Sequence, residues 1–330
     1  MVTGSNRVAL VLGDPGGIGP ELVAKLLADK KNLEDASVLL IADRAEVDLG
    51  AEIAGMPFSY RLVNSPDSIV DAEAGEVLLF HHRGDAVGPF ARAASSESGG
   101  AYTLATLAIA LDLARSGIVD SVCYAPLNKA SLHKAGMTQS DELHWFVDFL
   151  EHDGAISEIN IMSGIWTSRI TSHVALKDVA GLLTAEKIAV SAQLLFNSMT
   201  DAGRKDIKLG VCGLNPHNGD DGAFGSEESE IIEPGIALAQ NWGIPAKGPY
   251  APDTVFVRAQ EGELNAVVTM YHDQGQIAMK LMGFWQGVTL NGGLDIPVVS
   301  AAHGTAFDIY GKGVARVGPM EAAFSIAKQM

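Results

Sequence analysis

Three histidines lie in polar, glycine-containing segments that each follow an apolar run. They are His173 in TSHVAL, His217 in LNPHNGDDG and His272 in MYHDQG. Neutral imidazoles at three strand ends can converge on one divalent ion and leave coordination positions open for a substrate, which is how a catalytic metal site is built. Their wide spacing is not a local ligand motif, so a surface or core role for each histidine stays open.

Two charged residues near His272 extend this chemistry. Asp273 can orient the imidazole or accept a proton, and Lys280, eight residues after His272, can anchor a substrate anion or donate a proton. Ordinary solvated side chains are the alternative for both residues.

The segment HGTAFDIYGKG, residues 303–313, offers a different chemistry. His303 and Gly304 can supply imidazole and backbone contacts to an adenine ring, and Asp308 can accept hydrogen bonds from ribose hydroxyls. This pattern favours a nicotinamide cofactor site. An ordinary loop with a helix-capping aspartate is the alternative.

A glycine-rich turn, GDPGGIGPE at residues 13–21, lies between an apolar run and a helical pattern. Its backbone N–H groups can face an anion there. The chain has no G-x-x-x-x-G-K-[ST] motif and this turn has no G-x-G-x-x-G register, so neither a P-loop nor a Rossmann fingerprint is indicated. A plain Gly/Pro turn is the alternative interpretation.

The elements that must position these residues alternate between short apolar runs and longer helical patterns. This alternation is typical of βαβ units and predicts an α/β fold with a mostly parallel sheet. Residues 159–176 differ, because two strand-like runs follow one another around Gly164 without room for a crossover helix. They predict an antiparallel hairpin inserted in the sheet.

Composition excludes several functional classes. The chain has 330 residues and a formal net charge of −17, which disfavours nucleic acid and anionic membranes as partners. Hydrophobic residues at 47% against 19% charged residues predict a well-buried globular protein. Its two cysteines lie in apolar runs, and no apolar stretch has the roughly 20 residues of a membrane helix. We therefore expect a cytoplasmic protein.

Read in chain order, these segments resemble the 4-hydroxythreonine-4-phosphate dehydrogenase family of vitamin B6 biosynthesis; the further matches are APLNKASLHKAG and GPYAPDTVF. The resemblance implies a two-lobed α/β/α fold like that of isocitrate and isopropylmalate dehydrogenases, with an antiparallel insertion. One lobe would comprise about 1–125 with 290–330, the other about 126–289, with the active site in the cleft between them. A homodimer sharing its active sites is also implied.

The same resemblance implies a reaction and a set of ligands. The family oxidises a secondary alcohol of a hydroxy acid with NAD and a divalent metal such as zinc, magnesium, manganese or cobalt, and the β-keto acid then loses carbon dioxide. Its metal ligands fall on His173 and His217, with the partner subunit's His272 completing the set. Its substrate-binding lysine falls on Lys280, and the 303–313 segment is similar to an adenine-binding loop.

Four substrate-binding positions depart from the family pattern. Glu142 and Leu143 stand where the family has a histidine and a threonine, and Thr289 and Val298 stand where it has an asparagine and an arginine. Losing a guanidinium and an imidazole while gaining a carboxylate removes donors that a phosphate needs. The sequence thus favours an unphosphorylated sugar acid or cyclic cis-diol carboxylate.

Other substrates and one other activity stay open. A 4-phosphorylated threonate or erythronate, or 4-hydroxythreonine 4-phosphate itself, would keep the same chemistry. An acyl or phosphoryl transferase is the alternative from another class, because one scaffold can serve unrelated reactions.

Overall fold

The computed structural model describes residues 6–84, 88–283 and 286–330. The chain divides into two compact units, Met1–Asp153 with Leu294–Met330 and Gly154–Gly293. The first unit contains both chain ends, so the polypeptide passes from one unit to the other twice.

The first unit is built on a parallel sheet in the order β3-β4-β2-β1-β5-β12. Its strands are β1 (Asn6–Val11), β2 (Ala36–Ala42), β3 (Arg61–Val63), β4 (Val77–His81), β5 (Ser121–Tyr124) and β12 (Val298–Ala301). All of β2 is buried, as expected of a parallel strand covered on both faces.

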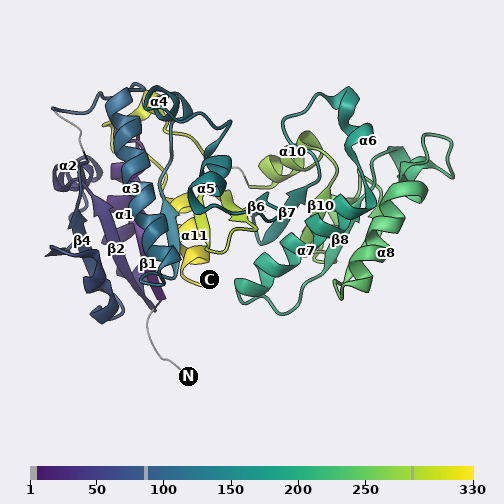
Figure 1. The fold of residues 1–330 in the computed structure, drawn as a ribbon, viewed down its shortest axis with the longest axis horizontal. Coiled ribbons are helices and arrows are strands. Elements are labelled where there is room, and N and C mark those ends of the chain that lie inside the picture. The colour runs from purple at the N-terminus through teal and green to yellow at the C-terminus, as the bar shows by residue number, and fades with distance from the viewer. Residues whose placement is uncertain (1–5, 85–87, 284–285) are drawn as a thin grey trace. The chain divides into compact units, whose positions relative to one another are not determined.

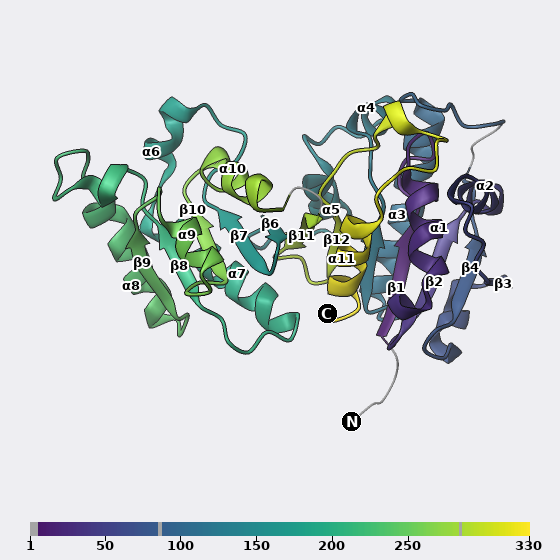
Figure 2. The ribbon, with the colours of Figure 1, turned by 180° about the vertical axis from the view of Figure 1, so that it is seen from behind.

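Helices cover both faces of this sheet. They are α1 (Gly19–Ala28), α2 (Arg44–Ala54), α3 (Glu97–Arg115), α4 (Lys129–Lys134), α5 (Glu142–Leu150) and α11 (Gly318–Ala327). Helices α3 and α5 lie on the face seen in Figure 1, and α1 and α11 lie on the face seen in Figure 2. Side-chain caps start α2, α3, α4 and α5; Ser96, for example, accepts from the Gly99 amide for α3, and Asp141 from the His144 amide for α5.

The segment 126–153 lies in the first unit, whereas the sequence placed it in the second lobe. The physical reason is the apolar face of α5. Phe146 is fully buried in the cluster formed by α3 and the sheet, where its ring meets Tyr124 edge-on with centroids 5.8 Å apart. Sequence periodicity identifies such a face but not the surface that covers it.

The second unit has strands in the order β11-β6-β7-β10-β8-β9. They are β6 (Ser157–Met162), β7 (Ile165–Arg169), β8 (Leu209–Cys212), β9 (Ala246–Tyr250), β10 (Ala266–Thr269) and β11 (Val288–Gly292). Pairing is parallel from β7 through β9 and antiparallel for β11-β6-β7. The predicted hairpin is therefore confirmed, with Gly164 at its turn in the left-handed region.

The helices of this unit are α6 (Val179–Leu182), α7 (Ala185–Asp201), α8 (Glu233–Asn241), α9 (Val255–Gln260) and α10 (His272–Gly283). Helix α10 lies against the β6–β7 hairpin (Figure 1). Within the described residues, no single helix is long and apolar enough to cross a membrane; one helix pair, Leu176–Leu182 with Ala185–Asp201, meets that criterion jointly but is bent by 96°.

Candidate active site

The three histidines follow three neighbouring strands of the second unit. His173 comes after β7, His272 after β10 and His217 after β8, and these strands pair in parallel in the order β7-β10-β8. The carboxyl ends of parallel strands meet at one edge of a sheet, where α/β proteins bind their ligands. Topology thus brings the histidine-bearing loops to the same edge.

Two of the histidines are in contact. The ring centroids of His173 and His272 lie 5.7 Å apart with the planes tilted by 40°. Imidazoles sharing one ion through metal–nitrogen bonds of about 2.0–2.1 Å place their centroids roughly 5–6 Å apart, so this pair fits a common divalent ion. Asp273 Oδ1 lies 2.7 Å from His272 Nδ1, which leaves Nε2 as the ring nitrogen available to an ion.

A cavity of about 350 Å³ opens beside these rings. Its other lining residues are Thr171, Val174, Leu176, Val179, Tyr271 and Asp273. Burial raises the pKa of Tyr271, and the charge of Asp273 adds to this shift. Its phenol therefore stays protonated and can donate a hydrogen bond to a molecule in the cavity.

His217 occupies the neighbouring loop, exposed and with a left-handed backbone at φ 54°; His173 has φ 51°. This conformation is uncommon for a non-glycine residue and often accompanies a functional constraint.

Gln274 links the ends of β10 and β8, because its side chain accepts a hydrogen bond from the Met270 amide and donates one to the Gly213 carbonyl. In the part of the chain that the structure describes, no three His, Cys, Asp or Glu side chains meet at one point.

A guanidinium that no sequence motif indicated lies close to this edge. Arg169, with its side chain 6% exposed, donates to Glu158 at 2.6 Å, to Asn160 at 2.7 Å and to Ser172 at 2.8 Å. Asn160 also accepts from Gln276 and lies opposite Thr289 in the β6–β11 ladder. The available signal was an isolated arginine ending an apolar strand, but its partner depends on hairpin register.

Helix α10 carries a polar stripe over this network. His272, Gln276 and Lys280 are spaced by four residues, which places them on one helix face. Gln276 points to Asn160, and Lys280 is exposed one turn further on. The structure therefore places Lys280, Thr289 and the histidine pair in the same unit.

The other substrate positions lie in the first unit. Glu142 and Leu143 begin α5, and the Glu142 carboxylate lies 3.8 Å from the Lys129 ammonium with Oε2 buried and without a hydrogen bond. Val298 is fully buried in the apolar core of this unit. Within the unit as described, its side chain packs against protein and is not exposed to a substrate.

The predicted cofactor residues are accessible. His303 is half-buried, Gly304 and Asp308 are exposed, and a Cβ at Gly304 would meet no atom within 4 Å. No protein atom therefore excludes a side chain at position 304, and the space beside this residue is available to a ligand. This arrangement fits a nucleotide over the 303–308 segment.

The turn at residues 13–21 uses its amides internally. The Gly16 amide donates to Asp14 Oδ1, the Gly17 amide to the Asp14 carbonyl, and the Ile18 amide to the Thr305 carbonyl. These three donors are consequently unavailable to an anion, which favours the structural interpretation. Burial raises the pKa of Asp14, an effect that hydrogen bonds from Ser131 and Gly16 partly oppose.

Comparison with known proteins shows which family the chain resembles. Residues 34–327 match the family model of "Pyridoxal phosphate biosynthetic protein PdxA". A Pseudomonas aeruginosa protein provisionally named 4-hydroxythreonine-4-phosphate dehydrogenase 2 is 51% identical, with 98% of this chain and 96% of that protein covered. The D-threonate 4-phosphate dehydrogenase of Bordetella bronchiseptica is 34% identical, with 98% and 92% covered.

A solved structure of a related dehydrogenase has the same fold. The crystal structure of 4-hydroxythreonine-4-phosphate dehydrogenase from Klebsiella pneumoniae aligns with a TM-score of 0.85 at 28% identity, covering 98% of both chains. The protein is therefore an oxidoreductase of α/β architecture, and the predicted fold class is confirmed. More specifically, the chain belongs to the PdxA family, whose curated relatives are named dehydrogenases.

Proposed function

We propose that this protein is a divalent-metal-dependent, NAD-linked dehydrogenase that oxidises a secondary alcohol of a hydroxy acid, with decarboxylation of the resulting β-keto acid. The observation that carries the proposal is that the loops bearing His173, His217 and His272 meet at one edge of the sheet, at the carboxyl ends of parallel strands and beside a cavity. The metal would be zinc, magnesium, manganese or cobalt, and the protein would act in the cytoplasm as a homodimer.

The residues take distinct roles in this proposal. His173, His217 and the partner subunit's His272 hold the ion, and Asp273 fixes the ring of the His272 in its own subunit through Nδ1. A bound ion would lower the pKa of the substrate hydroxyl and polarise the ketone, while NAD would accept the hydride. Asp273, being exposed, can also relay the hydroxyl proton to solvent, and Lys280 anchors the substrate carboxylate.

His303, Gly304 and Asp308 bind the cofactor in this proposal. Asp308 accepts hydrogen bonds from the ribose hydroxyls. Its carboxylate is accessible to them because the residue is exposed in the short 307–309 helical turn. A carboxylate at this position favours NAD over NADP, since a 2′-phosphate would meet like charge.

The substrate end is proposed to bind an unphosphorylated hydroxy acid, a sugar acid or a cyclic cis-diol carboxylate, through Glu142, Leu143 and Thr289; Val298, which is fully buried, makes no contact with it. The Glu142 carboxylate disfavours a phosphate by like charge, and Lys129, 3.8 Å from its Oε2, is the cation that balances it. A 4-phosphorylated hydroxy acid is the second candidate, because the relatives are named for phosphorylated substrates, 4-hydroxythreonine 4-phosphate and D-threonate 4-phosphate.

NADH formation against a panel of hydroxy acids, with and without a chelator, tests the reaction. We expect loss of turnover on exhaustive metal removal and in His173→Ala, with recovery when the divalent ion is restored to the wild type. Full activity without metal would refute the metal role. Offering one hydroxy acid with and without its phosphate tests the substrate class, because strong preference for the phosphorylated form would refute the argument from Glu142.

A further inference from the structure

The turn at residues 13–21 and the first helix hold both ends of the segment 303–315. At the near end, the Ile18 amide donates to the Thr305 carbonyl, and a Cβ on Gly17 would lie 2.7 Å from the Thr305 Cβ. Only a glycine permits that approach. The loop that bears His303 is therefore packed directly on the start of α1.

The far end is held by an ion pair inside the same unit. Lys25 Nζ donates to Glu21 Oε1 at 2.7 Å, to the Gly313 carbonyl at 2.9 Å and to the Ala315 carbonyl at 2.7 Å. Glu21 Oε1 in turn accepts from the Ala315 amide at 2.8 Å. With side chains 14% and 2% exposed, Lys25 and Glu21 form a buried clamp on residues 313–315.

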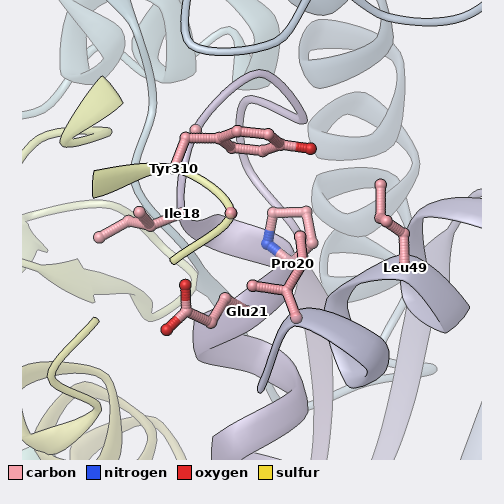
Figure 3. A pocket seen from close by; sticks show the side chains of 8 residues that line it. Ile18, Pro20, Glu21, Leu49 and Tyr310 are labelled. Atoms are coloured by element: carbon pink, nitrogen blue, oxygen red, sulfur yellow. The ribbon is translucent and has the colours of Figure 1, made fainter. Parts of the chain in front are cut away.

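This clamp is enclosed by protein. Figure 3 shows Glu21 below and Tyr310 above a narrow hollow, with Ile18, Pro20 and Leu49 around it. The hollow does not admit a water molecule, so Glu21 is not hydrated from this side. A buried pair of this kind loses much more when one partner is removed than an exposed pair does.

We propose that Glu21 and Lys25 are positioning residues for the cofactor loop: by fixing residues 313–315 while Gly17 and Ile18 fix Thr305, they keep His303 and Asp308 in the arrangement that NAD binding requires. The inference rests on the proposed function. It assigns the 13–21 turn a role in cofactor binding that involves no contact with the cofactor.

The test separates affinity for NAD from turnover in the full chain. Apparent affinity falls with the fraction of molecules in the binding-competent form, so a loop that is competent in roughly one molecule in ten raises KM for NAD about tenfold. We expect Lys25→Met to do this while kcat and KM for the hydroxy acid change less than about twofold. Glu21→Gln should change KM in the same direction, and Lys25→Arg, which keeps the donors, should restore most of the affinity.

Arg7→Met is the matched control. Arg7 also joins a carboxylate, Asp120 at 3.0 Å, to a backbone carbonyl, that of Gly117 at 3.1 Å, in the same unit. It should lower the melting temperature without changing KM for NAD. The proposal is overturned if Lys25→Met leaves KM for NAD within twofold of the wild type, or if Arg7→Met raises it equally.

Amide hydrogen exchange provides a readout that needs no activity. The amides of Ile309, Tyr310, Lys312 and Ala315 donate hydrogen bonds within the loop or to the clamp. Lys25→Met should lower the protection of these amides. Unchanged protection would refute the role of Lys25 and Glu21 in holding residues 313–315, and would leave the proposed function untouched. Absence of both NAD binding and NAD-linked turnover in the wild type would instead refute the proposed function, and with it the cofactor role of the clamp.

Discussion

Replacing Arg169 by methionine should destabilise the protein by about 2–3 kcal/mol, through loss of its bond to Glu158. Removing one partner of a fully buried pair costs about 3–5 kcal/mol. The cost is smaller here because the Glu158 side chain is 35% exposed and can be hydrated, which screens its charge. Asn160 keeps the hydrogen bond from Gln276, and Ser172 is exposed, so these two partners add little.

A double-mutant cycle with Glu158→Gln isolates the pair. Neutralising the carboxylate in the Arg169→Met background should recover about 1 kcal/mol, because an unpaired charge is removed. The assay is urea unfolding followed by circular dichroism. Arg258→Met is the control: its pair with Glu263 has a similar length, 2.8 Å, but both side chains are about half exposed, so a loss below about 1 kcal/mol is expected.

The reasoning is refuted if Arg169→Met costs less than about 0.5 kcal/mol, or if the two substitutions are additive within about 0.5 kcal/mol. Either result would mean that the guanidinium is solvated in the native state. The polar network between β6, β7 and α10 would then not be a fixed part of the site.

Two further predictions concern buried groups of the first unit. Because burial raises the pKa of Asp14 above 3.8, the folded state binds the proton more tightly than the unfolded chain, and stability is lost as pH rises through the raised pKa. Urea midpoints of the wild type relative to Asp14→Asn should therefore fall as the pH rises above 3.8; an equal pH dependence of the two proteins would contradict this. Gly100→Ala should cost several kcal/mol, more than the roughly 1–3 of ordinary overpacking, because the new Cβ would lie 1.9 Å from the Ser131 carbonyl oxygen. Gly181→Ala is its control in α6, where a Cβ meets nothing within 4 Å, and a melting temperature unchanged in both variants would show that α3 and α4 can separate.

Much of the architecture followed from local pattern. The alternation of apolar runs and helical segments predicted the α/β class, and the lack of a crossover helix around Gly164 predicted the β6–β7 hairpin. Local pattern did not assign residues 126–153 to their unit, because Phe146 could bury its ring against either lobe on amphipathicity alone.

The candidate site was predictable in part for the same reason. Histidines after apolar strands were visible in the chain, and their convergence at one sheet edge followed once the order β7-β10-β8 was known. The contact between His173 and His272, and the position of His217 in a separate loop, depended on backbone conformations that residue type does not fix.

The sequence by itself determined which chemical groups are present and which stand at strand ends, since side-chain type and hydrophobic period are local properties. Only the tertiary structure decided which of those groups meet. Arg169 finds Glu158 through hairpin register, and Lys25 reaches Gly313 across almost 300 residues of sequence. The amides of the 13–21 turn were free to bind an anion as far as the sequence showed; the fold committed them to Asp14 and Thr305, because buried N–H groups must be paired.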